Sequence, residues 1–210
     1  MALTVCGSAA RADRAAEDAA LAGRLPENQV LAGSGGRAAR VGDELILTLA
    51  DNRTLVFHGQ ECGAGKSACR SFRLAADLPS RHAFLIALRQ DGRAAGYVLL
   101  DDRDGARVNL DGLPVFAPDD SRFLLALDGV GDNPHAFEIW RRGDKGWALE
   151  WSYGWKRAFD SDPNLQRRPW RARVVRWTGE RIDLAFSASA RRWKGALVHG
   201  ADGWRLLRAG

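Results

Sequence analysis

Residues that bind metals or act as nucleophiles are few in this chain. The cysteines are Cys6, Cys62 and Cys69, and the histidines are His58, His82, His135 and His199. No two histidines have the spacing of a metal site, and none lies beside a serine or cysteine in a known nucleophile motif. The sequence therefore favours no enzyme, and we expect neither a metal nor a cofactor. A hydrolase is an alternative, because its paired carboxylates would meet only in three dimensions.

Long apolar runs are missing as well. No stretch approaches the ~20 residues of a membrane-spanning helix, so we expect a soluble mature chain. The periodicity of an amphipathic helix is absent after residue 36, which argues against a helical domain. Short apolar runs instead alternate with turn residues, a pattern typical of antiparallel strands joined in a meander.

Thirteen apolar runs between residues 44 and 208 are predicted to form strands. They lie at 44–49, 54–58, 71–75, 83–89, 95–100, 106–110, 122–127, 136–141, 147–152, 171–177, 181–187, 193–199 and 204–208. Asp91-Gly92, Asp104-Gly105 and Asp202-Gly203 are predicted hairpin turns, because these residues tolerate positive φ. We therefore predict an all-β fold, an antiparallel meander of blade-like sheets that forms either a partial propeller or two packed sheets.

One part of the chain carries a family resemblance. Residues 110–126 read L-D-G-L-P-V-F-A-P-D-D-S-R-F-L-L-A, and residues 137–140 read F-E-I-W. From Leu110 to Trp140 the chain resembles the P-x-F-S-P-D-G-x-x-L hairpin of WD-like β-propeller repeats, with Ala117 and Asp120 in place of the usual serine and glycine. The resemblance implies a Pro-Asp turn between two central strands of a blade. It does not imply a closed propeller, since thirteen strands make about three blades of four and propellers typically have at least four.

The N-terminal residues have features of a secretion signal. The first seven residues are mostly apolar, and Ala10-Arg11-Ala12 before Asp13 has the small-x-small form of a cleavage site. We therefore expect a periplasmic or secreted protein. An ordinary cytosolic N-terminus is the alternative, because a basic leader is missing. The predicted parts are a remnant of a signal peptide (1–12), a leader or linker that is helical or disordered (13–36), and a single β domain (37–210).

Tryptophan and positive charge are concentrated near the C-terminal end. All eight tryptophans lie in the last 71 residues, which hold 16 Lys and Arg against 7 Asp and Glu, whereas residues 1–139 hold 15 against 19. Strict alternation in the strand that begins at Trp147 would place Trp147, Trp151 and Trp155 on one face, which normally means core. The net charge of +5 is too diffuse to indicate DNA binding, so we expect no nucleic-acid partner.

The longest segment without a strand pattern, residues 156–169, lies between two tryptophans. The candidate recognition residues are Trp155, Arg157, Arg167, Arg168 and Trp170. Aromatic rings supply stacking area, and guanidinium groups supply charge and forked hydrogen bonds. The leading interpretation is an exported, non-catalytic binding module for a protein partner. A carbohydrate- or cell-wall-binding module with the same Trp and Arg surface is the alternative, and a packed core with a solvated loop is the structural interpretation of the same residues.

The first prediction concerns the cysteines. Cys62 and Cys69 close the short loop C-G-A-G-K-S-A-C, and we predict that they form a disulfide in an oxidising compartment. Such a bridge contributes on the order of 2 kcal/mol by restricting the unfolded chain. Mass spectrometry of the non-reduced protein should recover the two cysteine peptides linked. Two free thiols would contradict the bridge and weaken the argument for export.

Overall fold

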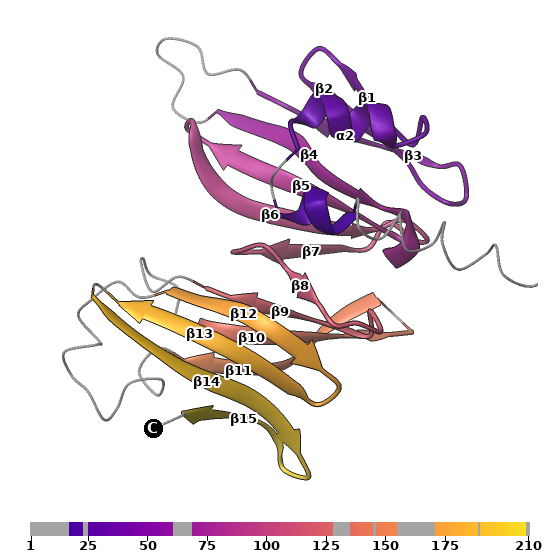
Figure 1. The fold of residues 1–210 in the computed structure, drawn as a ribbon. Helices are drawn as coiled ribbons and strands as arrows, with labels where there is room; N and C mark the ends of the chain where they lie inside the picture. The colour runs from indigo at the N-terminus through magenta and orange to yellow at the C-terminus, as the bar shows by residue number, and fades with distance from the viewer. Residues whose placement is uncertain are drawn as a thin grey trace, which may run out of the picture. The chain divides into compact units, whose positions relative to one another are not determined.

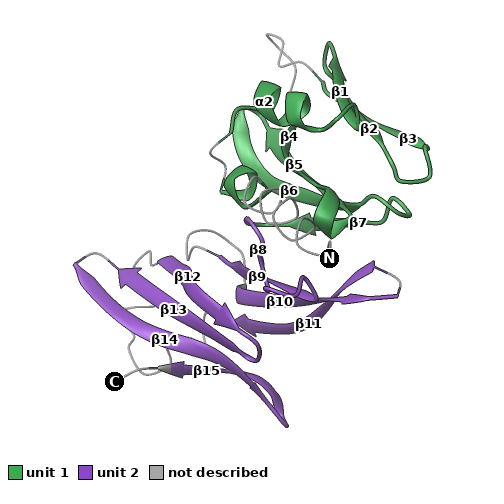
Figure 2. Cartoon of the chain, turned by 45° about the vertical axis from the view of Figure 1, so that its right-hand side comes forward, with its two compact units in different colours: residues 1–111 green, residues 112–210 purple. Residues whose placement is uncertain are grey.

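The computed structural model describes residues 17–22, 25–60, 69–127, 135–144, 146–154, 171–188 and 190–208. The chain divides into two compact units, unit 1 (Met1–Asp111) and unit 2 (Gly112–Gly210) (Figure 2). The expected single β domain over residues 37–210 stays a prediction.

The fold is all-β, as predicted, and its four antiparallel sheets have their strands in chain order (Figure 1). The first sheet of unit 1 contains β1 (Ala38–Val41), β2 (Glu44–Thr48) and β3 (Thr54–His58), and its second contains β4 (Arg70–Leu78), β5 (Ala83–Gln90), β6 (Arg93–Asp101) and β7 (Arg107–Leu110). The first sheet of unit 2 contains β8 (Val115–Phe116), β9 (Arg122–Ala126), β10 (His135–Gly143) and β11 (Gly146–Gly154). Its second sheet contains β12 (Arg171–Thr178), β13 (Arg181–Ala188), β14 (Arg191–Gly200) and β15 (Gly203–Arg208). Each sheet is a blade-like meander, and the likeness to a propeller repeat stays a prediction.

Helices are short and lie mainly near the N-terminal end. Residues 17–21 are helical, α2 spans Glu27–Gly33, and η1 (Pro79–Arg81) is a single 3-10 turn. Helix α2 packs on β4 and buries Val30. A Glu27 carboxylate oxygen accepts a hydrogen bond from the Leu74 N–H at 2.8 Å and pairs with Arg40 at 2.6 Å. The predicted leader therefore includes a helix that is part of the unit 1 core.

The core of unit 1 joins its two sheets and α2. Leu45 and Leu47 of β2 and Phe84 and Ile86 of β5 have no solvent exposure and belong to one apolar cluster with Val30. Leu45 and Leu47 alternate with half-buried residues along β2, as expected for a strand with one face in a core. Each such side chain contributes roughly 1.5–3 kcal/mol through burial.

The core of unit 2 likewise joins two sheets. Phe137 and Ile139 come from β10, and Ile182, Leu184 and Phe186 come from β13. The Phe137 and Phe186 rings meet edge to face with centroids 6.1 Å apart. In the view of Figure 1 the sheet β12–β15 lies in front of the sheet β8–β11, so its second face is turned toward the reader.

The three predicted Asp-Gly hairpins are confirmed. Asp91 and Gly92 both have positive φ, 52° and 75°, and form a two-residue loop between the paired ends of β5 and β6. This is the geometry that suits the right-handed twist of two strands. Gly105 and Gly203 also have positive φ, at the turns from β6 to β7 and from β14 to β15. Beyond residue 36 the described chain contains only the short turn η1 as helix, in agreement with the prediction.

All thirteen predicted strands occur, and β1 and β8 are additional. Strand β8 has two residues and directly follows Pro114, and β1 has four residues and follows the Gly-rich segment 33–36. Alternation cannot be recognised over so few residues. Both strands form because a longer neighbour supplies hydrogen-bond partners, β2 for β1 and β9 for β8.

A bulge in β11 contradicts the predicted common face of its tryptophans. The pairing of β10 with β11 shifts register between Ile139 and Trp140, which leaves Glu150 without a paired residue. An extra residue of this kind turns the rest of the strand over. Trp151 packs against the unit 2 core, whereas Trp147 packs against Phe123, with ring centroids 4.9 Å apart and outside that cluster. Trp155 lies outside the described residues.

The second prediction tests the approach of β6 to β7. Gly96 has φ of +125°, and a Cβ there would lie 2.7 Å from the Leu110 carbonyl oxygen. Gly96→Ala should therefore lower the free energy of unfolding of unit 1 by roughly 2 kcal/mol or more, because backbone strain and a clash add. All tryptophans lie in unit 2, so urea unfolding is followed by far-UV circular dichroism.

Gly92→Ala is the matched control. Gly92 also has positive φ, but a Cβ there meets nothing within 4 Å. This variant should lose only about 1 kcal/mol, the cost of the left-handed conformation alone. Equal losses in the two variants would show that the approach of Gly96 to Leu110 is not a constraint.

Candidate functional site

The sheet β12–β15 presents a face outside the core of unit 2, which we call the outer face. Along β13 the buried Ile182, Leu184 and Phe186 alternate with residues that are exposed or half-buried. Residues paired across neighbouring strands lie on the same side of a sheet, so the pairing extends this alternation to all four strands. By this rule the rows of the outer face are Arg171, Ser187 and Arg192; Arg173, Ala185 and Lys194; Arg176, Asp183, Ala196 and Leu207; and Thr178, Arg181, Val198 and Arg205.

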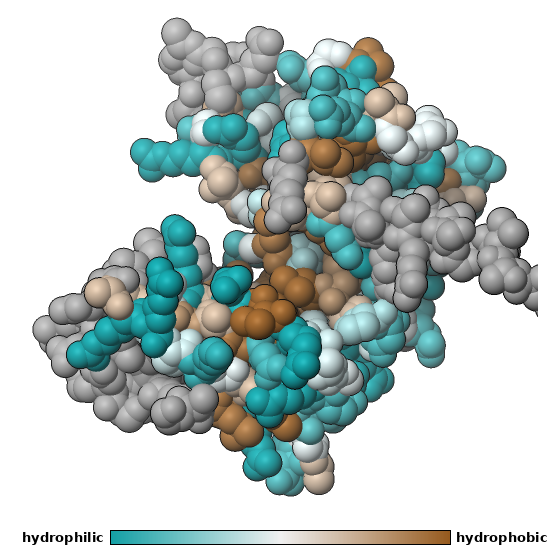
Figure 3. Space-filling model, in the orientation of Figure 1, coloured by the Kyte–Doolittle hydropathy of each residue, from teal (hydrophilic) through white to brown (hydrophobic). Residues whose placement is uncertain are grey.

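Positive charge dominates this face. Seven of the side chains in these rows are Arg or Lys, and Asp183 alone is a carboxylate. Figure 3 shows long hydrophilic side chains standing out over β12 and β13. The sequence argument against nucleic acid considered the net charge of the whole chain, whereas on this face cations outnumber carboxylates seven to one. The face therefore has the electrostatic character of a site for an anionic partner. The absence of a nucleic-acid partner stays a prediction.

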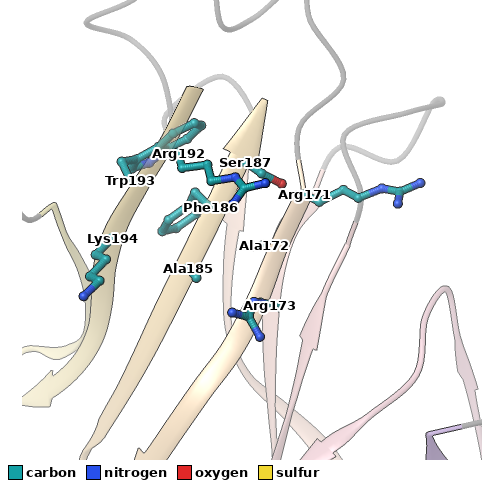
Figure 4. A pocket seen from close by; sticks show the side chains of 9 residues that line it. All are labelled: Arg171, Ala172, Arg173, Ala185, Phe186, Ser187, Arg192, Trp193 and Lys194. Atoms are coloured by element: carbon teal, nitrogen blue, oxygen red, sulfur yellow. The ribbon is translucent and has the colours of Figure 1, made fainter. Parts of the chain in front are cut away.

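The first two rows of the outer face surround an open hollow of about 620 Å³. Its lining contains Arg171, Arg173, Arg192 and Lys194, the small residues Ala172, Ala185 and Ser187, and Phe186 and Trp193. In Figure 4, Arg192 reaches from β14 toward Ser187, Arg173 stands on β12, and Arg171 points away from the hollow. The small side chains of β13 thus form a floor between the cations of β12 and those of β14.

Asp183 neutralises only the end of the face nearest the turn between β12 and β13. It accepts hydrogen bonds from Arg181 at 2.7 Å and from Arg176 at 3.2 Å. The hydrogen bond from Arg181 is the largest influence that holds the pKa of Asp183 below its usual range. Within the described part of the chain no carboxylate pairs with Arg173, Arg192 or Lys194. The charge of the hollow is therefore left for solvent or a partner.

The described tryptophans do not form a recognition surface on this face. Trp177 and Trp204 are buried in the unit 2 core, and Trp193 stacks on Phe186 with centroids 5.3 Å apart. Trp151 stacks on Tyr153 beside the same core. None of the side chains in the four outer-face rows is aromatic, although Phe186 and Trp193 line the hollow from the side of the core. Trp151, Trp177 and Trp204 therefore have a packing role, whereas Trp193 both packs on the core and lines the hollow.

The candidate recognition residues lie outside the described residues. This holds for Trp155, Arg157, Arg167, Arg168 and Trp170. In the sequence these residues directly precede Arg171, which begins β12 and lines the cationic hollow. The structure therefore leaves those residues as predictions and adds Arg173, Arg192 and Lys194. Their signal in the sequence was the alternation Arg-x-Arg in one predicted strand and Arg-x-Lys at the start of another.

Only one of the two cysteines in the predicted bridge lies within the described residues. Cys69 is buried, its N–H donates to an Asp91 carboxylate oxygen at 3.1 Å, and its sulfur belongs to a disulfide. Cys62 lies outside the described residues. The pairing of Cys62 with Cys69 stays a prediction.

A polar cluster connects the two sheets of unit 2. Arg122 of β9 pairs with Glu150 at 2.7 Å, and the Trp204 Nε1–H of β15 donates to Glu150 at 3.2 Å. His199 Nδ1 lies 2.9 Å from Glu180. Burial disfavours the charged form of Glu150, but the bonds from Arg122 and Trp204 outweigh it and lower its pKa. A general acid needs a raised pKa, so this cluster fits a structural connection better than the hydrolase alternative.

Unit 1 contains two buried carboxylates that share one arginine. An Arg37 guanidinium nitrogen lies 2.6 Å from Asp102 and 3.4 Å from Asp77. One oxygen of each carboxylate has no hydrogen-bond partner. Burial raises the pKa of Asp77 to about 6, although Arg37 acts in the opposite direction. This group is therefore a source of pH dependence in unit 1.

The described residues were also compared with the requirements of a membrane-spanning helix and of a metal site. No helix in the described ranges is long and apolar enough to cross a membrane. Among the described side chains, no group of three or more His, Cys, Asp or Glu is arranged to hold a metal ion.

Comparison with protein-family models, curated proteins and solved structures gave no match.

The third prediction concerns Asp77. Its folded pKa lies above its unfolded value, so its contribution to stability is full below about pH 4 and is lost as the pH rises through about 6. The loss amounts to roughly 3 kcal/mol by pH 7.5. Asp77→Asn cannot ionise, so urea unfolding of this variant, followed by circular dichroism, should show a smaller decline between pH 4.5 and 7.5. Asp43→Asn, an exposed carboxylate in the same unit, is the control. Parallel pH profiles for wild type and Asp77→Asn would contradict the assignment.

Proposed function

We propose that this protein is an exported, non-catalytic binding module that holds a protein partner by charge on the outer face of β12–β15. The single observation that carries the proposal is the cationic hollow, in which Arg173, Arg192 and Lys194 surround a floor of small side chains without an acidic partner among the described residues. Uncompensated like charges on one face cost free energy through repulsion. A partner with carboxylates would remove that cost.

Arginine supports a carboxylate-bearing partner in particular. Its planar guanidinium forms two parallel hydrogen bonds to one carboxylate, which a lysine ammonium cannot do. Arg173 and Arg192 are both exposed and face the hollow from different strands. The partner would therefore gain orientation as well as charge neutralisation from this face.

A carbohydrate-binding module is less well supported by the outer face. Neutral sugars stack on aromatic side chains, and none of the side chains in the four outer-face rows is aromatic. The two rings that line the cationic hollow, Phe186 and Trp193, stack on each other beside the unit 2 core. That alternative depends on Trp155 and Trp170, which lie outside the described residues.

Export remains part of the proposal. Its support comes from the small-x-small sequence before Asp13 and from Cys69, which is buried and belongs to a disulfide. Disulfides persist in oxidising compartments such as the periplasm or the extracellular space.

The fourth prediction tests the cationic hollow with poly-L-glutamate, an anionic polypeptide. Arg173→Ala combined with Lys194→Ala should weaken binding of fluorescently labelled poly-L-glutamate about tenfold or more at low salt, measured by anisotropy. The dependence of affinity on salt should also become shallower, because fewer charges are neutralised on binding. The tryptophan-monitored stability of unit 2 should stay within about 0.5 kcal/mol, since both side chains are exposed and unpaired.

Arg70→Ala combined with Arg93→Ala is the control of equal charge change. These cations are exposed in unit 1 and lie far along the chain from the hollow. The control should bind poly-L-glutamate almost as well as wild type. Equal weakening in both double variants would indicate an effect of net charge alone, and absence of binding by the wild-type protein would overturn the proposal.

A further inference from the structure

We infer that the outer face binds an extended polypeptide segment in which a short acidic run adjoins apolar residues. The inference rests on the proposed function, because it specifies the partner chemistry of the same face. The observation that supports it is a second hollow, which shares Lys194 with the cationic hollow and is partly apolar.

The cationic hollow matches an extended acidic chain in its spacing. Arg192 and Lys194 on β14 are two residues apart, which corresponds to about 6.7 Å along a strand, and Arg173 faces the hollow from β12. Alternate side chains of an extended polypeptide have the same repeat of about 6.7 Å. The two cationic strands are separated by β13, which places them roughly 9.5 Å apart. A chain lying over the small floor residues would direct alternate carboxylates to the two sides.

The second hollow is partly apolar. It has a volume of about 490 Å³ and shares Lys194 with the first. Val175 and Leu207 line it, and they are 58% and 41% exposed, which makes them two of the most exposed large apolar side chains described. Leu207 pairs with Ala196 and so belongs to the outer face. A polypeptide that covers both hollows would bury these side chains.

Val175 faces outward because of a second bulge. The pairing of β12 with β13 shifts register between Val174 and Arg176, so Val175 has no paired residue on β13. Val174 packs against the unit 2 core, whereas Val175 lines the outer hollow. Bulges commonly re-aim a side chain toward a functional surface. An apolar side chain exposed in this way, beside cations, favours an amphipathic partner over a purely anionic one.

Asp183 limits the length of the acidic run. It lies in the third row, lines the second hollow, and is held ionised by Arg181 and Arg176. An anionic chain that continued past Lys194 would meet this carboxylate and be repelled. An apolar residue at that point would instead meet Val175 and Leu207. The favourable anionic run is therefore short, about three or four residues, because Arg173, Arg192 and Lys194 face the hollow and Arg171 points away from it.

A phosphate polymer fits this surface less well. Polyphosphate gains nothing from Val175 or Leu207, and its charge does not stop before Asp183. Single-stranded nucleic acid binds tightly where bases stack on aromatic side chains, and the two rings that line the cationic hollow, Phe186 and Trp193, already stack on each other. The observations thus favour a polypeptide, and phosphate polymers become an outcome of the test.

The experiment compares two labelled peptides that share a run of four glutamates. One continues with two leucines and the other with two serines, and each is made in both chain directions. In anisotropy titrations of the full chain, the better leucine peptide should bind about tenfold more tightly than its serine counterpart, as expected for burial of apolar groups in one site. Val175→Thr combined with Leu207→Thr should remove that tenfold difference and leave the serine peptide unaffected. Arg173→Ala combined with Lys194→Ala should weaken both peptides.

The outcomes separate this inference from the proposed function. Equal affinity for leucine and serine peptides would overturn the inference and leave the anionic binding module intact. Tighter binding of polyphosphate or oligothymidylate of equal charge would overturn the inference and assign the face to phosphate. Failure of every anionic probe to bind would overturn both. Tryptophan-monitored unfolding of unit 2 verifies that each variant is folded, because the altered side chains are exposed.

Discussion

Strand alternation couples the two faces of the sheet β12–β15. Burial of Ile182, Leu184 and Phe186 against the sheet β8–β11 stabilises unit 2, and it turns the intervening residues of β13 outward. The same packing fixes the partners of β13, so the cations of β12 and β14 stand on either side of its small residues. A slip of one residue in register would bury those cations and expose the core side chains. The core of unit 2 therefore determines the geometry of the candidate site.

The two units differ in how their charged side chains are paired. In unit 1 the buried or half-buried charges have partners close by, as with Arg37 and Asp102 at 2.6 Å and Arg103 and Asp101 at 2.8 Å. In unit 2, Glu150 holds Arg122 between the sheets, but the outer face has one carboxylate for seven cations. A buried charge needs an oppositely charged partner to offset its loss of hydration, whereas an exposed cation is hydrated and needs no such partner. Because Arg173, Arg192 and Lys194 are exposed, solvent screens much of their mutual repulsion, and they remain available for binding.

Two β-bulges in unit 2 change the face of the sheet on which particular side chains lie. The bulge at Glu150 interrupts β11 and leaves a carboxylate that bonds to Arg122 and Trp204 between the sheets. The bulge at Val175 interrupts β12 and exposes an apolar side chain beside the cationic hollow. Each changes which face a side chain occupies, and each lies where the two-residue repeat alone predicts the opposite arrangement.

The sequence by itself determined the class of fold and most of its strands. Alternating apolar residues and Asp-Gly turns act locally, so the hairpin at Asp91-Gly92 and strands such as β3 were predictable at their positions. The Arg-x-Arg pattern before Val174 was also visible, but its meaning depended on what lies on the neighbouring strands. Only the tertiary structure brought Arg173 and Lys194 to either side of Ala185, and only the bulges assigned Val175 and Trp147 to their faces. Register and bulges depend on contacts between residues distant in the chain, and a local pattern does not contain them.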